Sequence, residues 1–281
     1  MEQIDIAAFI LNSSFFKKTP ISQIGEENVI NMLFFNGAID SFCPQCNSHS
    51  VFLGENDTAD KNQAKTNMFC GTDAPGYVKK QKIPHGIYQL DFSCSRNRNH
   101  KLYVTFRIDD NVITKIGQSP SPLELVKADH KQYAKLLGEC FSDLNSAVIL
   151  YANNFGIGAF TYLRRIIENY FLKTAFLSYK ESEPENPLLS SWESLRFKEK
   201  LDLVKGYLPH TFTDNPQIYS IVSSGIHGLS EEQCLEYFLV LKDCILLSLE
   251  EQLVEIKKAI TRENIKKSLA KIGSEVANAR K

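Results

Sequence analysis

Hydrophobic residues recur at helical spacing in the first part of the chain and at strand spacing after it. The segments 4–16 and 26–36 place apolar residues about every third or fourth position, which predicts two short amphipathic helices. Between 42 and 117 the apolar runs become short and are interrupted by Gly, Pro, Asn and Asp. Three strands are predicted, at 86–93, 102–108 and 112–116. The triplet 109–111 between the last two suits a hairpin turn.

A proline-rich boundary, Ser119-Pro120-Ser121-Pro122, separates this region from a helical one. Proline cannot donate to a strand ladder, and it disfavours the helical conformation in the residue before it. Beyond this boundary, apolar residues recur at helical spacing to near the C-terminus. The predicted helices cover about 122–153, 157–179, 193–207, 215–224 and 230–260, with an extension to about 277.

The composition of the 281 residues is that of an ordinary globular chain, with 43% hydrophobic residues, 23% charged residues and a net charge of -1. A nearly neutral chain has no overall attraction to nucleic acid or to an anionic membrane, so such binding requires a local patch. No apolar run approaches the roughly 18 residues of a membrane span, and the N-terminus lacks the basic region of a secretory signal. We therefore expect no membrane association.

The chain contains seven cysteines, an odd number, and three of them fall inside helical patterns: Cys140, Cys234 and Cys244. A reduced thiol in a helix packs as a small hydrophobic residue. Because reduced thiols are typical of the cytoplasm, we expect a cytoplasmic protein.

Two short clusters supply metal ligands. Cys43 and Cys46 form a Cys-x2-Cys pair, which places two sulfurs on one tight knuckle. Cys94 ends one predicted strand and His100 begins the next, so a loop between antiparallel strands would bring the second pair together. Three thiolates and one imidazole are a complete ligand set for a tetrahedral zinc ion. The sequence leaves three alternative ligands open, Cys70, His49 and His85, and the plainer alternative is a set of unrelated reduced cysteines.

Four protein ligands leave no position for water or substrate, so we expect this zinc to be structural. The metal would compensate for a β region too small to make a good core. The predicted fold class is α+β, mainly α, with a small antiparallel β zinc ribbon followed by an all-helical bundle. We expect N-terminal helices in 1–40, a zinc-ribbon-like β module in 41–118, and a helical domain in 122–281 that ends in a basic helix.

Candidate catalytic residues lie in two helical segments. In 156–168, a helix that follows a glycine break, Arg164 and Glu168 are four residues apart on the side opposite the apolar face, and Arg165 follows Arg164. The ordinary interpretation of Arg164 and Glu168 is a surface ion pair worth ~0.3–0.5 kcal/mol.

The second segment, 218–234, contains His227 in a glycine-flanked turn. A helix is predicted to begin at Glu231, because Ser230 and Gln233 form a capping box.

The Ala-x3-Leu-Arg-Arg-x2-Glu helix and the later Gly-x-His before a capped helix together resemble the HEPN-like all-helical domains of bacteria, over about residues 120–255. The likeness is to an uncharacterised family often encoded near restriction and phage-defence genes. In catalytic HEPN ribonucleases an arginine, followed four to six residues later by a histidine, forms the active centre, usually across a homodimer interface. His227 matches that histidine, but no arginine occupies the preceding positions. The resemblance therefore implies a homodimer and a catalytically degenerate domain.

A ribonuclease is the alternative hypothesis. Arg164 or Arg165, packed from a neighbouring helix, could replace the missing cation, with Glu168 orienting it. The imidazole of His227 would then move a proton while the guanidinium stabilises charge on the phosphorane, which needs no metal ion. The ordinary alternative is a structural cluster in which these side chains tie helices together.

Two small basic groups are candidate nucleic-acid contacts. Arg96, Arg98 and Lys101 lie beside the predicted metal ligands, and Lys257 and Lys258 lie in the C-terminal helix. The ordinary alternative for the helix is a solvated lysine face. The favoured hypothesis is thus a zinc-stabilised, HEPN-like regulatory or defence protein that binds RNA, DNA or a protein partner, without the standard HEPN chemistry.

Overall fold

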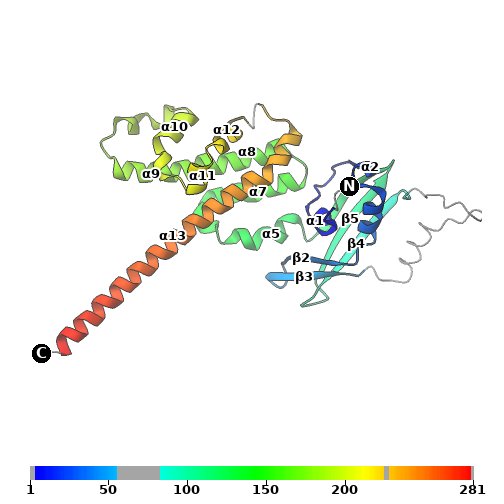
Figure 1. The fold of residues 1–281 in the computed structure, drawn as a ribbon, viewed down its shortest axis with the longest axis horizontal. Helices are drawn as coiled ribbons and strands as arrows, with labels where there is room; N and C mark the ends of the chain where they lie inside the picture. Colours follow the sequence, from blue (N-terminus) through cyan, green and yellow to red (C-terminus); the bar gives the residue numbers. More distant parts are fainter. Residues whose placement is uncertain (1–3, 56–82, 225–227, 280–281) are drawn as a thin grey trace, which may run out of the picture. The chain divides into compact units, whose positions relative to one another are not determined.

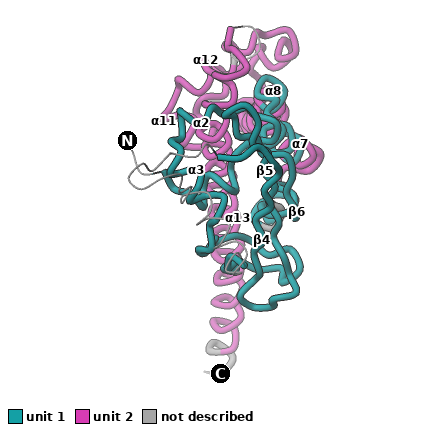
Figure 2. Tube along the Cα trace, turned by 90° about the vertical axis from the view of Figure 1, so that its right-hand side faces the viewer, with its two compact units in different colours: residues 1–135, 145–159 teal, residues 136–144, 160–281 magenta. Residues whose placement is uncertain are grey.

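The computed structural model describes residues 4–55, 83–224 and 228–279. By internal contacts the chain divides into two compact units (Figure 2). Unit 1 comprises residues 1–135 and 145–159, and unit 2 comprises 136–144 and 160–281. We describe each unit by itself.

Within the described residues, unit 1 is built on a six-stranded antiparallel sheet with the order β1-β6-β5-β4-β3-β2 (Figure 1). The strands are β1 (Thr19–Pro20), β2 (Ala38–Cys43), β3 (Ser48–Gly54), β4 (Gly86–Cys94), β5 (Lys101–Asp109) and β6 (Val112–Ser119). The three strands predicted from the sequence correspond to β4, β5 and β6. The other three were not predicted.

The β5–β6 hairpin forms for the reasons visible in the sequence. Buried and exposed residues alternate along β5, as expected for a strand with one face on a core. Asp109 pairs with Val112, and the two residues between them form the turn. Asp110 and Asn111 have φ angles of 45° and 60°, the left-handed region that a two-residue hairpin requires and that Asp and Asn tolerate.

The sheet and the N-terminal helices share one hydrophobic core, and this contradicts the predicted fold class. Helices α1 (Ile6–Asn12), α2 (Ile21–Ile24) and α3 (Glu26–Leu33) pack with the sheet. Ile10, Val29, Phe92 and Val104 are fully buried in the same cluster. The prediction of a small zinc ribbon followed by an all-helical bundle is therefore wrong: the β region is a complete α+β unit with a core of its own.

The change from strands to helices occurs at the predicted proline-rich boundary, since β6 ends at Ser119 and α5 begins at Pro122. The single helix expected over 122–153 is divided into four pieces: α5 (Pro122–Lys131), α6 (Ala134–Leu137), the 3-10 turn η1 (Gly138–Cys140) and α7 (Phe141–Ala152). Gly138 has a φ of 53°, a conformation that ends α6 and that glycine adopts without strain.

Unit 2 is helical, and its last helix is also its longest described element. Its elements include α8 (Gly156–Ile166), which begins in unit 1, the π-helical η2 (Ile167–Leu172), α9 (Lys173–Ser182), the 3-10 segments η3 (Pro187–Ser194) and η4 (Lys205–Tyr207), α10 (Phe197–Val204), α11 (His210–Asp214), α12 (Gln217–Ser224) and α13 (Glu231–Ala279). The predicted capping box is confirmed, because the Ser230 and Gln233 side chains each accept from the other's backbone N–H. Among the described helices, none is both long and apolar enough to cross a bilayer.

Candidate metal centre and basic loop

The first pair of candidate ligands lies on a tight knuckle between two strands. Cys43 ends β2, and β3 begins at Ser48. The backbone N–H of Asn47 donates to the carbonyl of Pro44 at 3.3 Å, and Asn47 has a φ of 50°. This turn places the side chains of Cys43 and Cys46 on the same side, as the Cys-x2-Cys spacing predicts.

The second pair flanks the loop between β4 and β5. Cys94 is the last residue of β4, and His100 immediately precedes β5. The backbone N–H of Cys94 donates to the carbonyl of His100 at 2.9 Å, which closes the loop at its base. Because Cys94 also pairs with Phe52 on β3, antiparallel pairing brings this loop beside the knuckle.

The four side chains converge, as the sequence predicted. Nδ1 of His100 lies 3.6 Å from Sγ of Cys43 and 3.2 Å from Sγ of Cys46. The Cys46 and Cys94 sulfurs are 3.8 Å apart, too far for the bond of about 2.0 Å in a disulfide. All four ligand atoms lie within 4.8 Å of one another, so the group is close enough to hold one metal ion.

The pKa values of Cys46 and Cys94 are shifted in opposite directions. Burial, together with the neighbouring Cys43 and Cys94, raises the pKa of Cys46 to about 11. Burial alone would also raise the pKa of Cys94. Hydrogen bonds from the Ser50 hydroxyl and from backbone N–H groups in the loop outweigh it and lower that pKa to about 6. Crowded thiols that interact in this way favour a bound cation, which stabilises every thiolate at once.

The two alternative ligands that the structure describes, His49 and His85, do not join this cluster. Nε2 of His49 lies 3.0 Å from Oδ1 of Asp129, and His85 Nδ1 lies 3.3 Å from Oδ1 of Asp109. His85 belongs instead to a separate, exposed group with Asp109 and Asp110. Cys70 lies outside the described residues.

The loop between the two ligands of the second pair is exposed and basic. Arg96 and Arg98 are exposed, and neither forms an ion pair with any residue that the structure describes. Lys101 behaves differently: its Nζ donates to Glu55 at 2.6 Å and to Ser93 at 3.0 Å, so its charge is already paired. Of the three basic residues predicted from the sequence, only Arg96 and Arg98 have no ion-pair partner among the residues that the structure describes.

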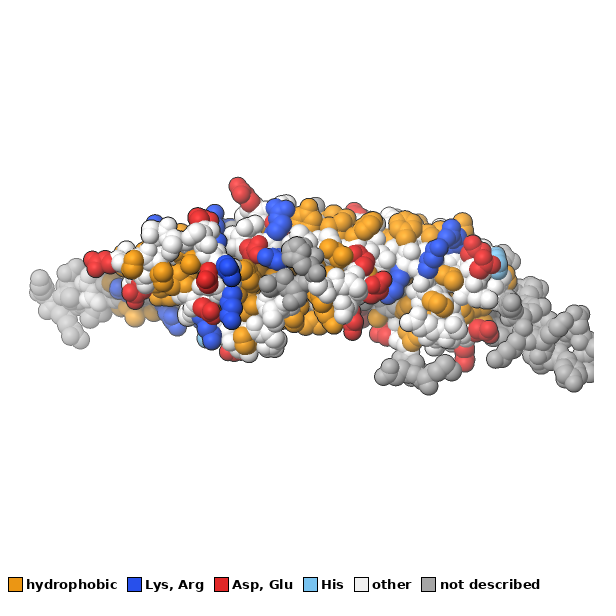
Figure 3. All heavy atoms as spheres, turned by 90° about the horizontal axis from the view of Figure 1, so that it is seen from above, with side chains coloured by type: hydrophobic (Ala, Val, Ile, Leu, Met, Phe, Trp, Pro, Cys, Tyr) orange, Lys and Arg blue, Asp and Glu red, His pale blue; other side chains and the backbone are white. Residues whose placement is uncertain are grey.

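The basic residues of the C-terminal helix belong to unit 2. Both Lys257 and Lys258 are exposed on α13, and Lys258 pairs with Glu255 at 2.7 Å. On the face shown in Figure 3, acidic and basic side chains are interspersed with hydrophobic ones, as the small net charge suggests.

The helical candidates are brought together only in part. Nε of Arg164 lies 2.8 Å from Oε1 of Glu168, and both residues line a cavity of about 610 Å³. Arg165 instead approaches Asp143, with 3.4 Å between Nη2 and Oδ1. His227 lies outside the described residues, so its predicted meeting with these side chains stays a prediction.

Two features of interest were not identified from the sequence. Ser50, whose hydroxyl lies 3.1 Å from the Cys94 sulfur, falls on an unpredicted strand. Lys115 lies on β6 with only 2% of its surface exposed. The alternating pattern of this strand does not indicate which groups the buried amine would contact.

Comparison with known proteins adds no assignment: no family model, curated protein or solved structure matches this chain.

Proposed function

We propose that Cys43, Cys46, Cys94 and His100 hold a structural zinc ion. A tetrahedron with Zn–S of about 2.3 Å and Zn–N of about 2.05 Å has edges of roughly 3.8 Å between sulfurs and roughly 3.6 Å between sulfur and nitrogen. The Cys46–Cys94 distance of 3.8 Å and the Cys43–His100 distance of 3.6 Å match these edges, whereas the Cys46–His100 distance of 3.2 Å is shorter than the sulfur–nitrogen edge. Zinc would supply a cross-link between β2–β3 and β4–β5, and four protein ligands leave it no position for a substrate.

The function that the geometry supports best is binding of RNA or DNA in a regulatory role. The observation that carries this proposal is the loop 95–99, which is exposed and held at both ends by candidate zinc ligands. Its two arginines have no ion-pair partner among the described residues. Guanidinium groups held on a rigid loop bind phosphate oxygens without paying for ordering of the loop. A protein partner is the competing outcome of the test.

The test is a binding titration with fluorescently labelled single-stranded RNA and duplex DNA. The Arg96→Ala/Arg98→Ala variant should bind at least roughly tenfold more weakly, with a smaller slope of log affinity against log salt by up to about two. The matched control, Lys17→Ala/Lys18→Ala, removes two exposed charges elsewhere in unit 1. Equal losses in both variants, or no salt-dependent binding by the wild type, would contradict the proposal and leave a protein partner as the explanation of the loop.

For unit 2, the HEPN-like resemblance and its bacterial defence setting remain proposals. The specific observation that favours a ribonuclease is that Arg164 and Glu168 line a cavity. Zinc-loaded protein should be incubated with total RNA in magnesium-free buffer without a chelator, since a chelator would also remove the zinc. Cleavage that is lost in both Arg164→Ala and His227→Ala would establish the ribonuclease. Intact RNA together with measurable binding would exclude it.

We also propose a homodimer and a cytoplasmic location. After Leu249, the last described buried residue on α13, this helix exposes apolar side chains, including Ile256 at 45% and Leu269 at 63% exposure. A second copy of the chain could cover them. Light scattering should give the wild type a mass that corresponds to two chains. The Ile256→Glu/Ile260→Glu variant should have half that mass. A monomeric wild type would contradict the proposal. The described cysteines form no disulfide with one another, which suits a reducing compartment.

A further inference from the structure

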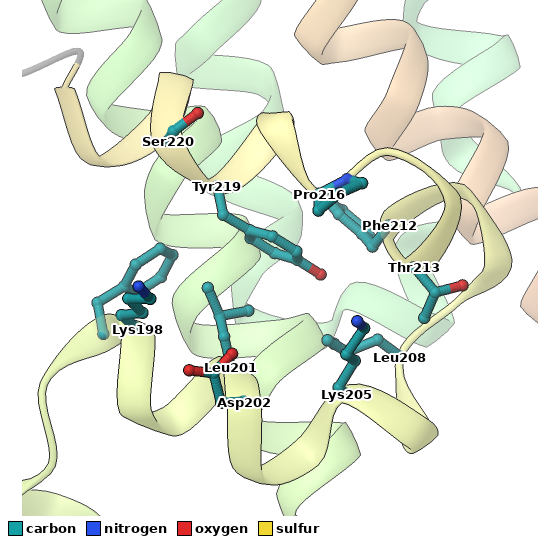
Figure 4. A pocket seen from close by; sticks show the side chains of 11 residues that line it. Lys198, Leu201, Asp202, Lys205, Leu208, Phe212, Thr213, Pro216, Tyr219 and Ser220 are labelled. Carbon is teal, nitrogen blue, oxygen red and sulfur yellow. The ribbon is translucent and has the colours of Figure 1, made fainter.

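A second cavity in unit 2 lies beside α10, α11 and α12 and has a volume of about 380 Å³ (Figure 4). Its floor is apolar: Leu201, Leu208 and Phe212 line it and are buried. This volume falls in the range of natural small-molecule sites, which combine apolar walls with few polar groups.

One buried polar group lies in the wall of this cavity. The side chain of Tyr219 extends from α12 toward the facing α10 and α11 side chains (Figure 4). Its hydroxyl oxygen is buried and, among the described residues, has no hydrogen-bond partner. Buried hydroxyl groups in folded proteins nearly always have a partner, so this hydroxyl at the wall of a cavity is a candidate donor to a bound molecule. Solvent does not reach this oxygen in the structure. Neighbouring side chains must therefore move before a ligand can accept a hydrogen bond from it.

The ring of Tyr219 is fixed in position. It stacks on Phe212 with 5.8 Å between ring centroids and an angle of 23°, and it meets Phe197 edge-on at 6.4 Å. Burial raises the pKa of Tyr219, so the phenol stays protonated at neutral pH and is available as a donor. Three aromatic rings around one cavity also favour an aromatic guest.

The charges at the opening favour an anion. Lys198 and Lys205 line the cavity, are exposed, and form no ion pair with any described residue. Asp202 lines the same opening, so its charged residues sum to one positive charge. The cavity thus has apolar and aromatic walls, one buried hydrogen-bond donor in its wall, and a net positive charge at its opening.

We propose that this cavity binds a small aromatic carboxylate, one of whose oxygens accepts a hydrogen bond from Tyr219. The site is distinct from the candidate metal centre and from the basic loop, both of which belong to unit 1. It assigns to unit 2 a ligand-binding activity that is independent of nucleic-acid binding.

The probe is 2-naphthoate, titrated into the full-length protein by isothermal calorimetry. Saturable one-to-one binding is expected, with a Kd below about 1 mM. Tyr219→Phe should weaken it roughly tenfold or more, because a hydrogen bond to a charged acceptor is lost. Tyr103→Phe, at an exposed tyrosine of unit 1, is the matched control and should bind like the wild type.

Folding and binding effects can be separated. Tyr219→Phe removes an unpartnered buried hydroxyl, so its thermal midpoint without ligand should equal or exceed that of the wild type. Lys205→Glu, at an exposed position, gives a second test: it should weaken 2-naphthoate and strengthen the cation 2-(aminomethyl)naphthalene. The proposal is overturned if 2-naphthoate does not bind at roughly millimolar concentration. It is also overturned if Tyr219→Phe, folded like the wild type, binds it equally well, or if Lys205→Glu leaves the preference between the two probes unchanged.

Discussion

The sulfur of Cys46 lies 3.2 Å from Nδ1 of His100, although the two residues are 54 positions apart in the chain. This contact joins the knuckle between β2 and β3 to the loop between β4 and β5. Such closeness of a thiol to a ring nitrogen, with two further thiols beside them, is the arrangement that metal binding requires of a folded site.

Zinc should be present in one equivalent per chain, and its removal should destabilise unit 1 without unfolding it completely. The sheet has a hydrophobic core of its own, so it should remain folded without zinc. The free energy of unfolding should fall only by the contribution of one cross-link, about 2–5 kcal/mol by analogy with a disulfide. Metal analysis and denaturant unfolding before and after chelation measure both quantities. Because the pKa of Cys46 is about 11 without metal, zinc binding must displace its proton, and the affinity should fall as the pH is lowered from about 8 to about 6. An affinity independent of pH would contradict this ligand set.

The choice of histidine ligand can be tested by a matched pair of variants. His100→Ala should lose zinc, because it removes one of the four converging donors. His49→Ala should retain one equivalent, because His49 is bound to Asp129 and stands outside the cluster. Zinc content measured after dialysis against a weak chelator distinguishes the two. Loss of metal from His49→Ala alone would require a different set of ligands.

Lys115 should make the stability of unit 1 depend on pH. Burial lowers the pKa of Lys115 to about 7, and its Nζ donates to the carbonyls of Ile10 and Leu11 at 2.9 and 2.8 Å. An unfolded lysine titrates near 10.4, so between about pH 7 and about pH 10 the unfolded chain binds a proton that the folded chain has released. The folded state is therefore favoured as the pH rises through this window, by at most ~1.4 kcal/mol per pH unit.

The measurement is the free energy of unfolding of wild type and Lys115→Met at several pH values. Because other groups titrate equally in both proteins, their difference isolates Lys115 and should move in favour of the wild type as the pH increases. A difference that stays constant across the window would show that Lys115 remains charged in the folded state.

Gly54 should not tolerate a side chain. A Cβ atom there would lie 2.6 Å from Cα of Asn36 and 2.8 Å from its carbonyl carbon, and backbone cannot withdraw as a flexible side chain could. Gly54→Ala is expected to cost about 1–3 kcal/mol. Gly273→Ala on α13 is the control, because no atom of the described residues lies within 4 Å of the added Cβ, and it should stabilise by about 0.4–1 kcal/mol. Unfolding midpoints that change alike in both variants would argue against this packing of β3.

The sequence predicted those parts of the molecule that local patterns determine. The convergence of Cys43, Cys46, Cys94 and His100 followed from their spacing, β4 to β6 from alternation, and the start of α13 from the Ser230 capping box. The sequence did not predict the strands that depend on pairing with distant parts of the chain. β1 has two residues, too few for any periodicity. β2 and β3 flank the knuckle without a clear alternating pattern. Without these strands the β region looked too small for a core, and the wrong fold class followed. The pocket at Tyr219 draws on three helices, and no local motif marks it.

The pairing of β3 with β4, and the convergence of Cys46 and Cys94 in one ligand cluster, fix the register of these two strands through contacts among the described residues. Closing a longer loop costs only about 0.6 kcal/mol for each doubling of its length. The free energy of closing the chain between the two strands should therefore depend only weakly on the length of the chain that joins them. An affinity tag or a fluorescent reporter spliced into that stretch should leave the sheet intact, which makes it a practical point of attachment for following this protein in cells.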